Sequence, residues 1–429
     1  MFWHGPGRCA GGPRLEEHDM NPTSPATVRT TGAATSGTAA AGTRTPATAS
    51  ATGTRTAAAS AGGTGTVLTR ASDVVGDHAE SQRSLLRARA RSTQLEAEIA
   101  ADAGRFRVLT GDRPTGRLHL GHYLATLRSR VRLQELGVRT FVVIADYQVI
   151  TDRDAPGPVR DRVLDLVADY LALGLDPGRT TIFAHSQVPE LNELMLPFLS
   201  LVTDAELRRN PTVKSELADS GGRPFSGLLL TYPVHQAADI LFCGANLVPV
   251  GKDQLPHLEL ARTIARRFAE RYGDAGLVAP EALLTDAPHV LGLDGRKMSK
   301  SRGNAVELAM SADQTAALVR SAVTDPDRVI TFDPVRRPEV ANLLLVGALC
   351  SGRTPTALAE EIGGRGAGAL KTFVTEAVNS ELAPLRRRRA ELVRDPGALR
   401  EVLRTGNGVA RELAADTLAR VHAALGMVY

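Results

Sequence analysis

The sequence predicts an α/β fold in which a parallel sheet with a helical insertion precedes an all-helical region. From Phe106 onward, short apolar runs alternate with segments of helical periodicity, a rhythm typical of parallel sheets. After about Leu308 the strand patterns stop and helical patterns continue. The hydrophobic fraction of 43% is ample for a buried core. No apolar run approaches the roughly 18 residues that a membrane span requires, so we expect no membrane partner.

Five segments are predicted as strands, and helical segments lie between them and after them. Residues 190–223 interrupt the rhythm with helices and a polar loop, so we predict an insertion that presents a surface to a partner. The predicted strands are Phe106–Leu109, Phe141–Ala145, Thr181–Ala184, Leu247–Val250 and Val290–Leu293. The predicted helices are Val159–Leu173, Leu258–Tyr272, Thr315–Val323, Val340–Ala348, Thr356–Ile362, Leu370–Arg389 and Val409–Leu425.

These patterns divide the chain into four parts. Residues 1–80 are predicted as a disordered tail rich in Thr, Ala and Gly, because they offer too little apolar surface to offset the entropy of folding. A transit peptide has a similar composition, but arginines are sparse here. Residues 81–104 are predicted as a helical lead-in, 105–307 as the sheet domain and 308–429 as a helical domain.

Composition sets broad limits on the function. A net charge of +4 and a pI near 9.1 are compatible with a nucleic-acid partner but do not require one. The cysteines Cys9, Cys243 and Cys350 form neither a CxxC pair nor a zinc spacing, so we predict free thiols in a reducing compartment and no metal site.

The first motif that carries chemistry is His119-Leu-Gly-His122, after the first predicted strand. The apolar spacing from Leu120 onward is helical, so both histidines lie at or just inside a helix N-terminus. Free backbone N–H groups and the helix dipole favour an anion there. The motif alone is compatible with a nucleotide phosphate site or with a helix cap that carries two incidental histidines.

The second motif is Lys297-Met-Ser-Lys-Ser301, in a polar loop after the last predicted strand. Two ammonium groups and two hydroxyls suit the charge that develops on a departing polyphosphate. The chain holds only five lysines, and two of them, Lys297 and Lys300, fall in this pentapeptide. A Walker A pattern is absent from the sequence, so the nucleotide is not bound as in P-loop proteins.

Together, the two motifs resemble the signatures of class I aminoacyl-tRNA synthetases, which flank an ATP site at the carboxyl ends of a Rossmann-type parallel sheet. The segments Leu230–Leu241, Val248–Gln254 and His257–Leu260 resemble the tryptophanyl-tRNA synthetases in particular. The resemblance covers the chain from about Phe106 to its end and implies a Mg²⁺–ATP-dependent ligase in the cytoplasm that is a homodimer. Its implied partners are L-tryptophan and tRNA(Trp), with the anticodon bound by the helical domain.

The resemblance also implies roles for individual residues, with Lys297, Lys300, His119 and His122 acting in catalysis. The tryptophan site would use Asp239 for the indole N–H, Tyr232 and Gln254 for the amino group, and Gln148 and Gln236 as pocket wall. The ATP site would comprise Arg113, Pro114, Thr115, Gly121, His122, Gly251, Lys252, Asp253, Val290, Lys297, Met298, Ser299, Lys300 and Ser301.

This chain departs from the common pattern of that family at several positions. Lys252 stands where an acidic residue is usual, Gln148 where histidine is frequent, and Gln236 where methionine is frequent. We therefore predict a more polar pocket wall. Two other functions remain compatible with the motifs: a tyrosyl-tRNA synthetase, and a catalytically inactive synthetase-like protein that binds RNA.

Overall fold

The computed structural model describes residues 71–151, 157–219, 226–284, 290–299 and 302–429, with side chains from residue 86 onward except 217–219. Two predicted site residues, Lys300 and Ser301, lie outside the described residues, as does the predicted tail up to residue 70. The described residues from Glu80 onward belong to one compact unit. Within the described part of the chain, no helix is long and apolar enough to cross a membrane.

A five-stranded parallel sheet lies at the centre of this unit. The strand order is β3-β2-β1-β4-β5, so the chain starts in the middle and builds outward on both sides. The register pairs Leu109 with Phe141 and Phe141 with Thr181. The parallel sheet confirms the predicted fold class. The strands are β1 (Arg107–Asp112), β2 (Arg139–Ile144), β3 (Thr180–Ala184), β4 (Leu247–Val250) and β5 (Glu281–Leu284).

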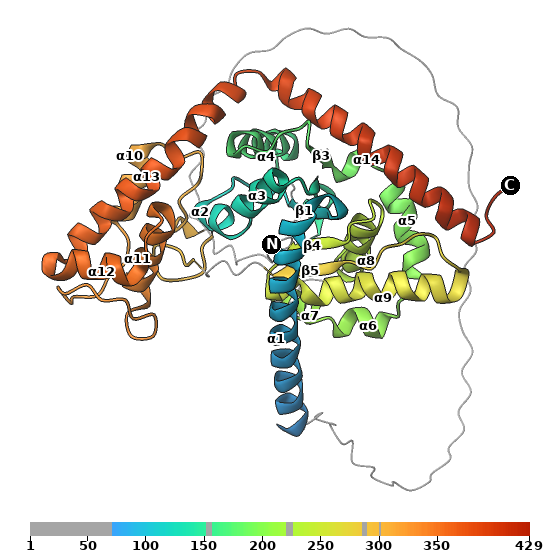
Figure 1. Ribbon diagram of the computed structural model, residues 1–429, viewed down its shortest axis with the longest axis horizontal. Helices are drawn as coiled ribbons and strands as arrows, with labels where there is room; N and C mark the ends of the chain where they lie inside the picture. The colour runs from blue at the N-terminus through green and yellow to red at the C-terminus, as the bar shows by residue number, and fades with distance from the viewer. Residues whose placement is uncertain (1–70, 152–156, 220–225, 285–289, 300–301) are drawn as a thin grey trace, which may run out of the picture. The chain divides into compact units, whose positions relative to one another are not determined.

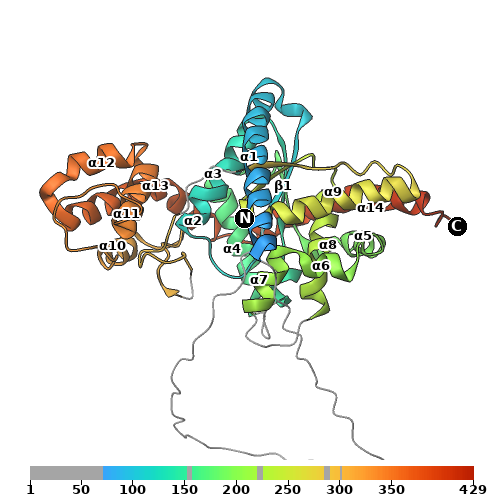
Figure 2. The ribbon, with the colours of Figure 1, turned by 90° about the horizontal axis from the view of Figure 1, so that it is seen from below.

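Helices cover the sheet and form the region that follows it (Figures 1 and 2). Residues 120–136 form a helical segment in three parts: α2 (Leu120–His122), a π-helical turn (Tyr123–Leu127) and α3 (Arg128–Leu136). The other helices are α1 (Ala71–Ala101), α4 (Val159–Leu173), α5 (Glu190–Leu199), α6 (Asp204–Arg209), α7 (Pro211–Asp219), α8 (Gly227–Leu241), α9 (Leu255–Tyr272), α10 (Ala312–Arg320), α11 (Pro338–Ser351), α12 (Pro355–Ile362), α13 (Gly366–Leu392) and α14 (Pro396–Ala424).

The fifth strand is not the predicted one. The predicted strand Val290–Leu293 is wrong, because among these residues only Leu291 forms a bridge, an isolated one with Lys297. The strand that pairs with β4 is Glu281–Leu284. The sequence Glu-Ala-Leu-Leu favours a helix by intrinsic propensity. Its environment overrides that preference, because α1 covers it: Arg91 forms an ion pair with Glu281, and the Leu284 N–H donates to Ser92 Oγ at 2.9 Å. Contacts with α1 and β4, rather than the propensity of its own residues, therefore make this segment a strand.

The lead-in helix α1 is longer than predicted. It begins at Ala71, so ten residues assigned to the tail are helical. Between Ala71 and Glu80 the residue that most disfavours a helix is Gly76, and it does not end α1. Farther along α1, Leu95 and Ile99 are buried in a cluster with residues of β1 and β4. The charged helix thus has one apolar stripe that packs on the sheet domain.

The last helix, α14, covers the open edge of the sheet at β3 (Figure 1). A Cβ atom at Gly406 would lie 1.9 Å from the Ile182 carbonyl oxygen, so only glycine allows this approach. Beside it, the Ala184 N–H donates to Asn407 Oδ1 at 2.9 Å. A covering helix protects an edge strand from pairing with another chain. Helix α14 is therefore part of the sheet's packing.

Helix α13 also contacts the sheet domain, through the arginine block Arg386–Arg389. Arg389 donates to Asp169 of α4 at 2.6 Å and also pairs with Asp165, and Arg386 Nη2 donates to Thr315 Oγ1 at 2.7 Å. These contacts bind two of the four arginines within the molecule. The division at residue 308 stays a prediction, because these helices share a buried cluster with β2 and α4.

Candidate active site

The predicted site residues gather at the carboxyl edge of the sheet. Arg113, Pro114 and Thr115 follow β1, and Gln148 lies in the short helix after β2. The segment from Gly251 to Gln254 follows β4 directly. Ligands of open parallel sheets bind at this edge because the connecting loops converge there. The topology therefore brings together segments that are more than 100 positions apart in sequence.

The two histidines of the first motif stack beside the start of α2. Their ring centroids are 3.7 Å apart, and the His119 backbone N–H donates to His122 Nδ1 at 3.2 Å. Because Nδ1 accepts this bond, the neutral His122 ring carries its proton on Nε2. That nitrogen can donate to a phosphate or ribose oxygen. The predicted position of His119 and His122 at a helix start is confirmed.

The second motif lies directly against the first. Gly121 is close to Met298, since a Cβ added to Gly121 would lie 3.1 Å from the Met298 sulfur. Backbone hydrogen bonds hold the two segments: the Leu120 N–H donates to the Val306 carbonyl at 2.8 Å, and the Leu308 N–H donates to the Leu118 carbonyl at 3.0 Å. The motifs therefore form adjacent walls of one site, although about 180 residues separate them.

Asn304 organises the lysine loop from within. Its Oδ1 accepts the Ser299 N–H at 2.8 Å, and its Nδ2 donates to the Lys297 carbonyl at 3.1 Å and to Asp294 at 2.6 Å. Gly292 makes room for the amide, because a Cβ there would lie 2.2 Å from Nδ2. Met298 is buried and Lys297 is exposed. The loop thus anchors its backbone and leaves the Lys297 ammonium group facing solvent.

Helix α8 carries the predicted amino-acid contacts on one buried face. Tyr232, Gln236 and Asp239 are each at most 3% exposed. Their spacing of four and three residues places them on the same side of a helix. Ser226 begins the helix by accepting the Leu229 N–H at 3.1 Å. Burial first, and Glu216 second, raise the pKa of Tyr232 well above its ordinary value, so its hydroxyl stays a neutral donor.

Two buried histidines that the sequence reasoning missed lie beside Asp239. His185 directly follows β3, and its Nε2 is 2.9 Å from Asp239 Oδ1. His235 of α8 stacks on His185 with ring centroids 4.0 Å apart. Burial, together with His185, lowers the pKa of His235 to about 4, so this ring is neutral at neutral pH. His185 could have been found from its place after a strand end, and His235 from its spacing of four residues before Asp239.

The predicted wall residue Gln148 belongs to the same cluster. It is fully buried, and its Nε2 lies 3.2 Å from His235 Nδ1. Thr151 Oγ1 donates to Gln148 Oε1 at 2.8 Å and fixes the amide. On the other side, Arg113 Nη1 donates to the Gln148 carbonyl at 3.4 Å. Gln148 therefore belongs to a buried polar cluster with two histidines and a carboxylate, and the role of this cluster as a pocket wall stays a prediction.

The segment Lys252–Gln254, which follows β4, has both exposed and buried side chains. Lys252 and Asp253 are exposed, whereas Gln254 is buried and its Nε2 donates to Asp253 Oδ2 at 2.8 Å. Val290, at the start of a described segment, is half-buried. Tyr232 and Gln254 come from different elements, and His257 lies 3.3 Å from the Tyr232 hydroxyl. Burial lowers the pKa of His257 to about 4.

His185, His235 and Asp239 are also residue types that bind transition metals, and their nitrogen and oxygen atoms lie within 4.8 Å of one another. Ring orientation argues against a shared ion. The imidazole planes are inclined by only 30° in a stack, whereas each nitrogen lone pair lies in its own ring plane. A metal about 2.0–2.1 Å from each nitrogen must lie near both planes. The stack therefore favours a recognition role over a metal site.

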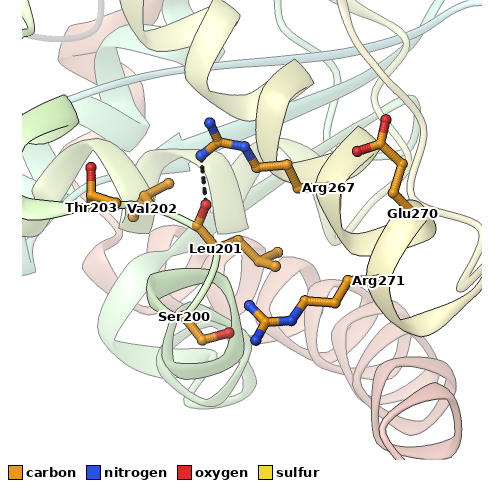
Figure 3. A pocket seen from close by; sticks show the side chains of 7 residues that line it. All are labelled: Ser200, Leu201, Val202, Thr203, Arg267, Glu270 and Arg271. Atoms are coloured by element: carbon orange, nitrogen blue, oxygen red, sulfur yellow. Dashed lines mark hydrogen bonds between the residues drawn. The ribbon is translucent and has the colours of Figure 1, made fainter.

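A shallow pocket lies away from this site, between the end of α5 and helix α9 (Figure 3). Arg267 points into it and donates to the Leu201 carbonyl at 2.7 Å and to Glu206 at 2.6 Å. Its charge is thus satisfied within the protein. One wall of this pocket belongs to the predicted insertion and the other to α9. The insertion's role as a partner surface stays a prediction.

Comparison with known proteins agrees with this geometry. The family model described as tRNA synthetases class I (W and Y) matches residues 101–383. A tryptophan--tRNA ligase of Clostridium longisporum is 42% identical over 334 residues, covering 75% of this chain and 97% of that protein. One of Streptococcus pyogenes serotype M1 is also 42% identical, covering 75% and 98%.

Solved structures show the same relationship. A tryptophanyl-tRNA synthetase from Campylobacter jejuni, complexed with ADP and tryptophan, matches with a TM-score of 0.66 and 32% identity, covering 75% of this chain and all of that one. A tyrosyl-tRNA synthetase from Archaeoglobus fulgidus, at 23% identity and a TM-score of 0.52, shares the fold. This chain belongs to the class I tRNA synthetases for tryptophan and tyrosine. Within that family, its curated relatives at 42% identity are tryptophan--tRNA ligases.

Proposed function

We propose that this protein is a ligase that activates L-tryptophan with ATP and transfers the tryptophanyl group to tRNA(Trp). The observation that carries the proposal is Asp239, a buried carboxylate on α8 at the edge of the site. Indole has one hydrogen-bond donor and no acceptor, so a carboxylate is its matched partner. A site built around that bond rejects analogues that lack the donor, because its own group is left unpaired.

The ATP end of the site is assigned to the two adjoining motifs and the loops beside them. His119, His122 and Gly121 would contact phosphate or ribose, with Arg113, Pro114 and Thr115 on the same edge of the sheet. Gly251, Lys252 and Asp253 would border the ribose and adenine, and Val290 the adenine. Lys297, Met298 and Ser299 would close over the leaving pyrophosphate, together with Lys300 and Ser301, which lie outside the described residues.

The tryptophan end would use the buried face of α8 and its neighbours. Asp239 would accept the indole N–H, and Tyr232 and Gln254 would hold the amino group. Gln148 and Gln236 would form the polar wall. The solved Campylobacter relative, complexed with ADP and tryptophan, supports a nucleotide and the amino acid in one protein of this fold.

The chemistry requires positioning and charge stabilisation more than covalent participation by side chains. The tryptophan carboxylate attacks the α-phosphate of ATP, the bond to the β-phosphate oxygen breaks, and pyrophosphate leaves. The terminal ribose hydroxyl of the tRNA then attacks the activated carbonyl and displaces AMP. Mg²⁺ would enter with ATP as part of the substrate, held mainly by phosphate oxygens and water.

The helical region after residue 308 would bind the anticodon. Arg387 and Arg388 are exposed on α13 and are the members of the arginine block suited to the RNA backbone. We also propose that the protein is a cytoplasmic homodimer, as the resemblance implies.

The decisive experiment is ATP–pyrophosphate exchange measured with each amino acid separately. Exchange that depends on tryptophan supports the proposal, and exchange that depends on tyrosine would replace it with the tyrosyl-tRNA synthetase function. Binding of RNA without exchange would identify a catalytically inactive relative. Charging of tRNA(Trp) transcript then tests the second step.

A further inference from the structure

His185 and Asp239 come from different elements and meet in the buried cluster that includes His235 and Gln148. His185 is fully buried at the end of β3, and the Asp239 side chain is 4% exposed on α8. Their atoms Nε2 and Oδ1 are 2.9 Å apart. At this separation a modest turn of the ring aligns an N–H with the carboxylate oxygen. The contact therefore concerns the carboxylate that is proposed to read the indole N–H.

The pocket around these residues contains buried polar atoms that require a partner. Within the described residues, His185 Nδ1 and Nε2, His235 Nε2, Gln236 Oε1 and Asp239 Oδ1 lack a hydrogen bond of good geometry. Such atoms are costly to bury, and in native proteins they generally find a partner in protein, water or ligand. His185 Nε2 and Asp239 Oδ1 can satisfy each other, and the other three atoms indicate that a bound molecule completes the network.

His185 is restrained so that one ring edge stays toward the carboxylate. The His235 ring stacks on it at 4.0 Å, and the Tyr147 ring meets it edge-on at 5.7 Å. Gln148 holds His235 at 3.2 Å, and Thr151 holds Gln148. The ring thus has neighbours on two sides, which leave it the modest turn that aligns Nε2 with Asp239 Oδ1 but disfavour larger rotations.

We propose that His185 is a positioning residue that sets the specificity for the indole N–H by holding Asp239 Oδ1. The inference rests on the proposed function. With Oδ1 held, the carboxylate cannot rotate about its Cβ–Cγ bond, and Oδ2 is presented to the substrate. The donor also stabilises the charged carboxylate in a buried site, where an uncompensated charge is strongly disfavoured. Without His185, the carboxylate loses its orientation and discriminates less between a ring N–H and an atom without a proton.

The test compares tryptophan with β-(benzothiophen-3-yl)alanine, its isostere in which sulfur replaces the indole N–H. ATP–pyrophosphate exchange is measured for wild type, His185→Ala, His185→Gln and Gln187→Ala. The glutamine variant restores a donor of similar reach. Gln187 is an exposed neighbour in the same short helix and serves as the matched control.

We expect His185→Ala to lower kcat/KM for tryptophan by about 10- to 100-fold, as for a lost hydrogen bond to a charged group. The value for the sulfur isostere should change by less than about threefold, because that substrate does not use the bond. His185→Gln should recover most of the ratio between the two substrates. Gln187→Ala should match wild type, and the KM for ATP should stay constant throughout.

An equal loss for both substrates, with no recovery in His185→Gln, would overturn the inference and leave His185 with a packing role. Thermal unfolding of each variant identifies loss of folding, and His185→Gln then carries the comparison of the two substrates. Absence of tryptophan-dependent exchange in the wild-type protein is a different outcome, because it rejects the proposed function itself.

Discussion

Two stacked histidine pairs lie in the site, and their surroundings give them different properties. His119 and His122 stack at 3.7 Å at the start of α2, where the second ring is partly exposed. His185 and His235 stack at 4.0 Å where both rings are at most 3% exposed. The first pair can meet phosphate in water, whereas the second lies among buried residues beside the Asp239 carboxylate. In the proposed function, similar ring geometry would serve anion binding at one end and recognition of a small donor at the other.

The largest expected effect concerns the phosphate end. Lys297→Ala should lower kcat of tryptophan-dependent exchange by about 100-fold or more, the loss typical when a group that stabilises developing charge is removed. The KM for tryptophan should stay nearly constant, because Lys297 is proposed to act on the leaving group. Arg296→Ala, at the exposed neighbouring position, is the control. A rise in the KM for tryptophan as large as the fall in kcat would contradict the separation of the two ends.

The buried His235 should make stability depend on pH. The pKa of His235 is about 4 in the folded protein against an ordinary 6.5, so the unfolded chain binds the proton more readily between those values. The free energy of unfolding should therefore fall as pH decreases from about 6.5 to 4, by about 3 kcal/mol from this group. Urea unfolding from pH 7.5 to 4.5 measures the slope. His235→Gln should reduce this slope, and part of the slope should remain because burial also lowers the pKa of His257 to about 4. Equal slopes in wild type and His235→Gln would contradict the assignment.

The amino-acid end should respond through substrate affinity. Asp239→Asn should lower kcat/KM for tryptophan by about 10- to 100-fold, because an amide oxygen accepts the indole N–H more weakly than a carboxylate. The KM for ATP should be unaffected. Asp416→Asn, at an exposed position of α14, controls for loss of charge. If the variant instead raises the KM for ATP with normal tryptophan kinetics, Asp239 does not face the amino acid.

The smallest effect should come from the junction between the two motifs. An alanine at Gly121 would place its Cβ 3.1 Å from both the His119 ring and the Met298 sulfur. Both neighbours are ends of flexible side chains, so the site should adjust, and the KM for ATP should rise about three- to tenfold. Gly368→Ala, where a Cβ meets open space, is the control. Exchange kinetics with varied ATP measure the effect. A change in the KM for tryptophan alone would contradict the assignment of Gly121 to the ATP site.

Much of the fold could be predicted because periodicity reports burial directly. Four strands and helix α4 lie where the alternation placed them, with shifts of at most three residues at strand ends. The strand β5 could not be predicted, because Glu281–Leu284 is made a strand by β4 and α1 rather than by its own residues. The same limit applies to α14, whose contact with β3 depends on Gly406, a residue without an apolar signal.

The candidate site was accessible from sequence where residues sit in motifs, and not where contacts are made across the fold. Asp239 and Lys297 stand in recognisable segments. His185 is a single histidine in Ala184-His-Ser186, and its partner is more than 50 positions away. Only the packing of α8 against the ends of β2 and β3 brings Gln148, His185 and His235 into one cluster. Such a cluster depends on how distant segments pack together, so the local sequence pattern could not predict it.

The close approach of α14 to β3 also bears on synthesis of the chain. Ribosomes release a protein from its N-terminus, and domains generally begin to fold in that order. Here the edge strand β3, which ends at Ala184, is covered by helix residues more than 220 positions later in the chain. The nascent sheet therefore keeps one edge uncovered until those residues have been translated. A ribosome that stalls near residue 395 would hold a chain with both motifs made and an aggregation-prone strand exposed.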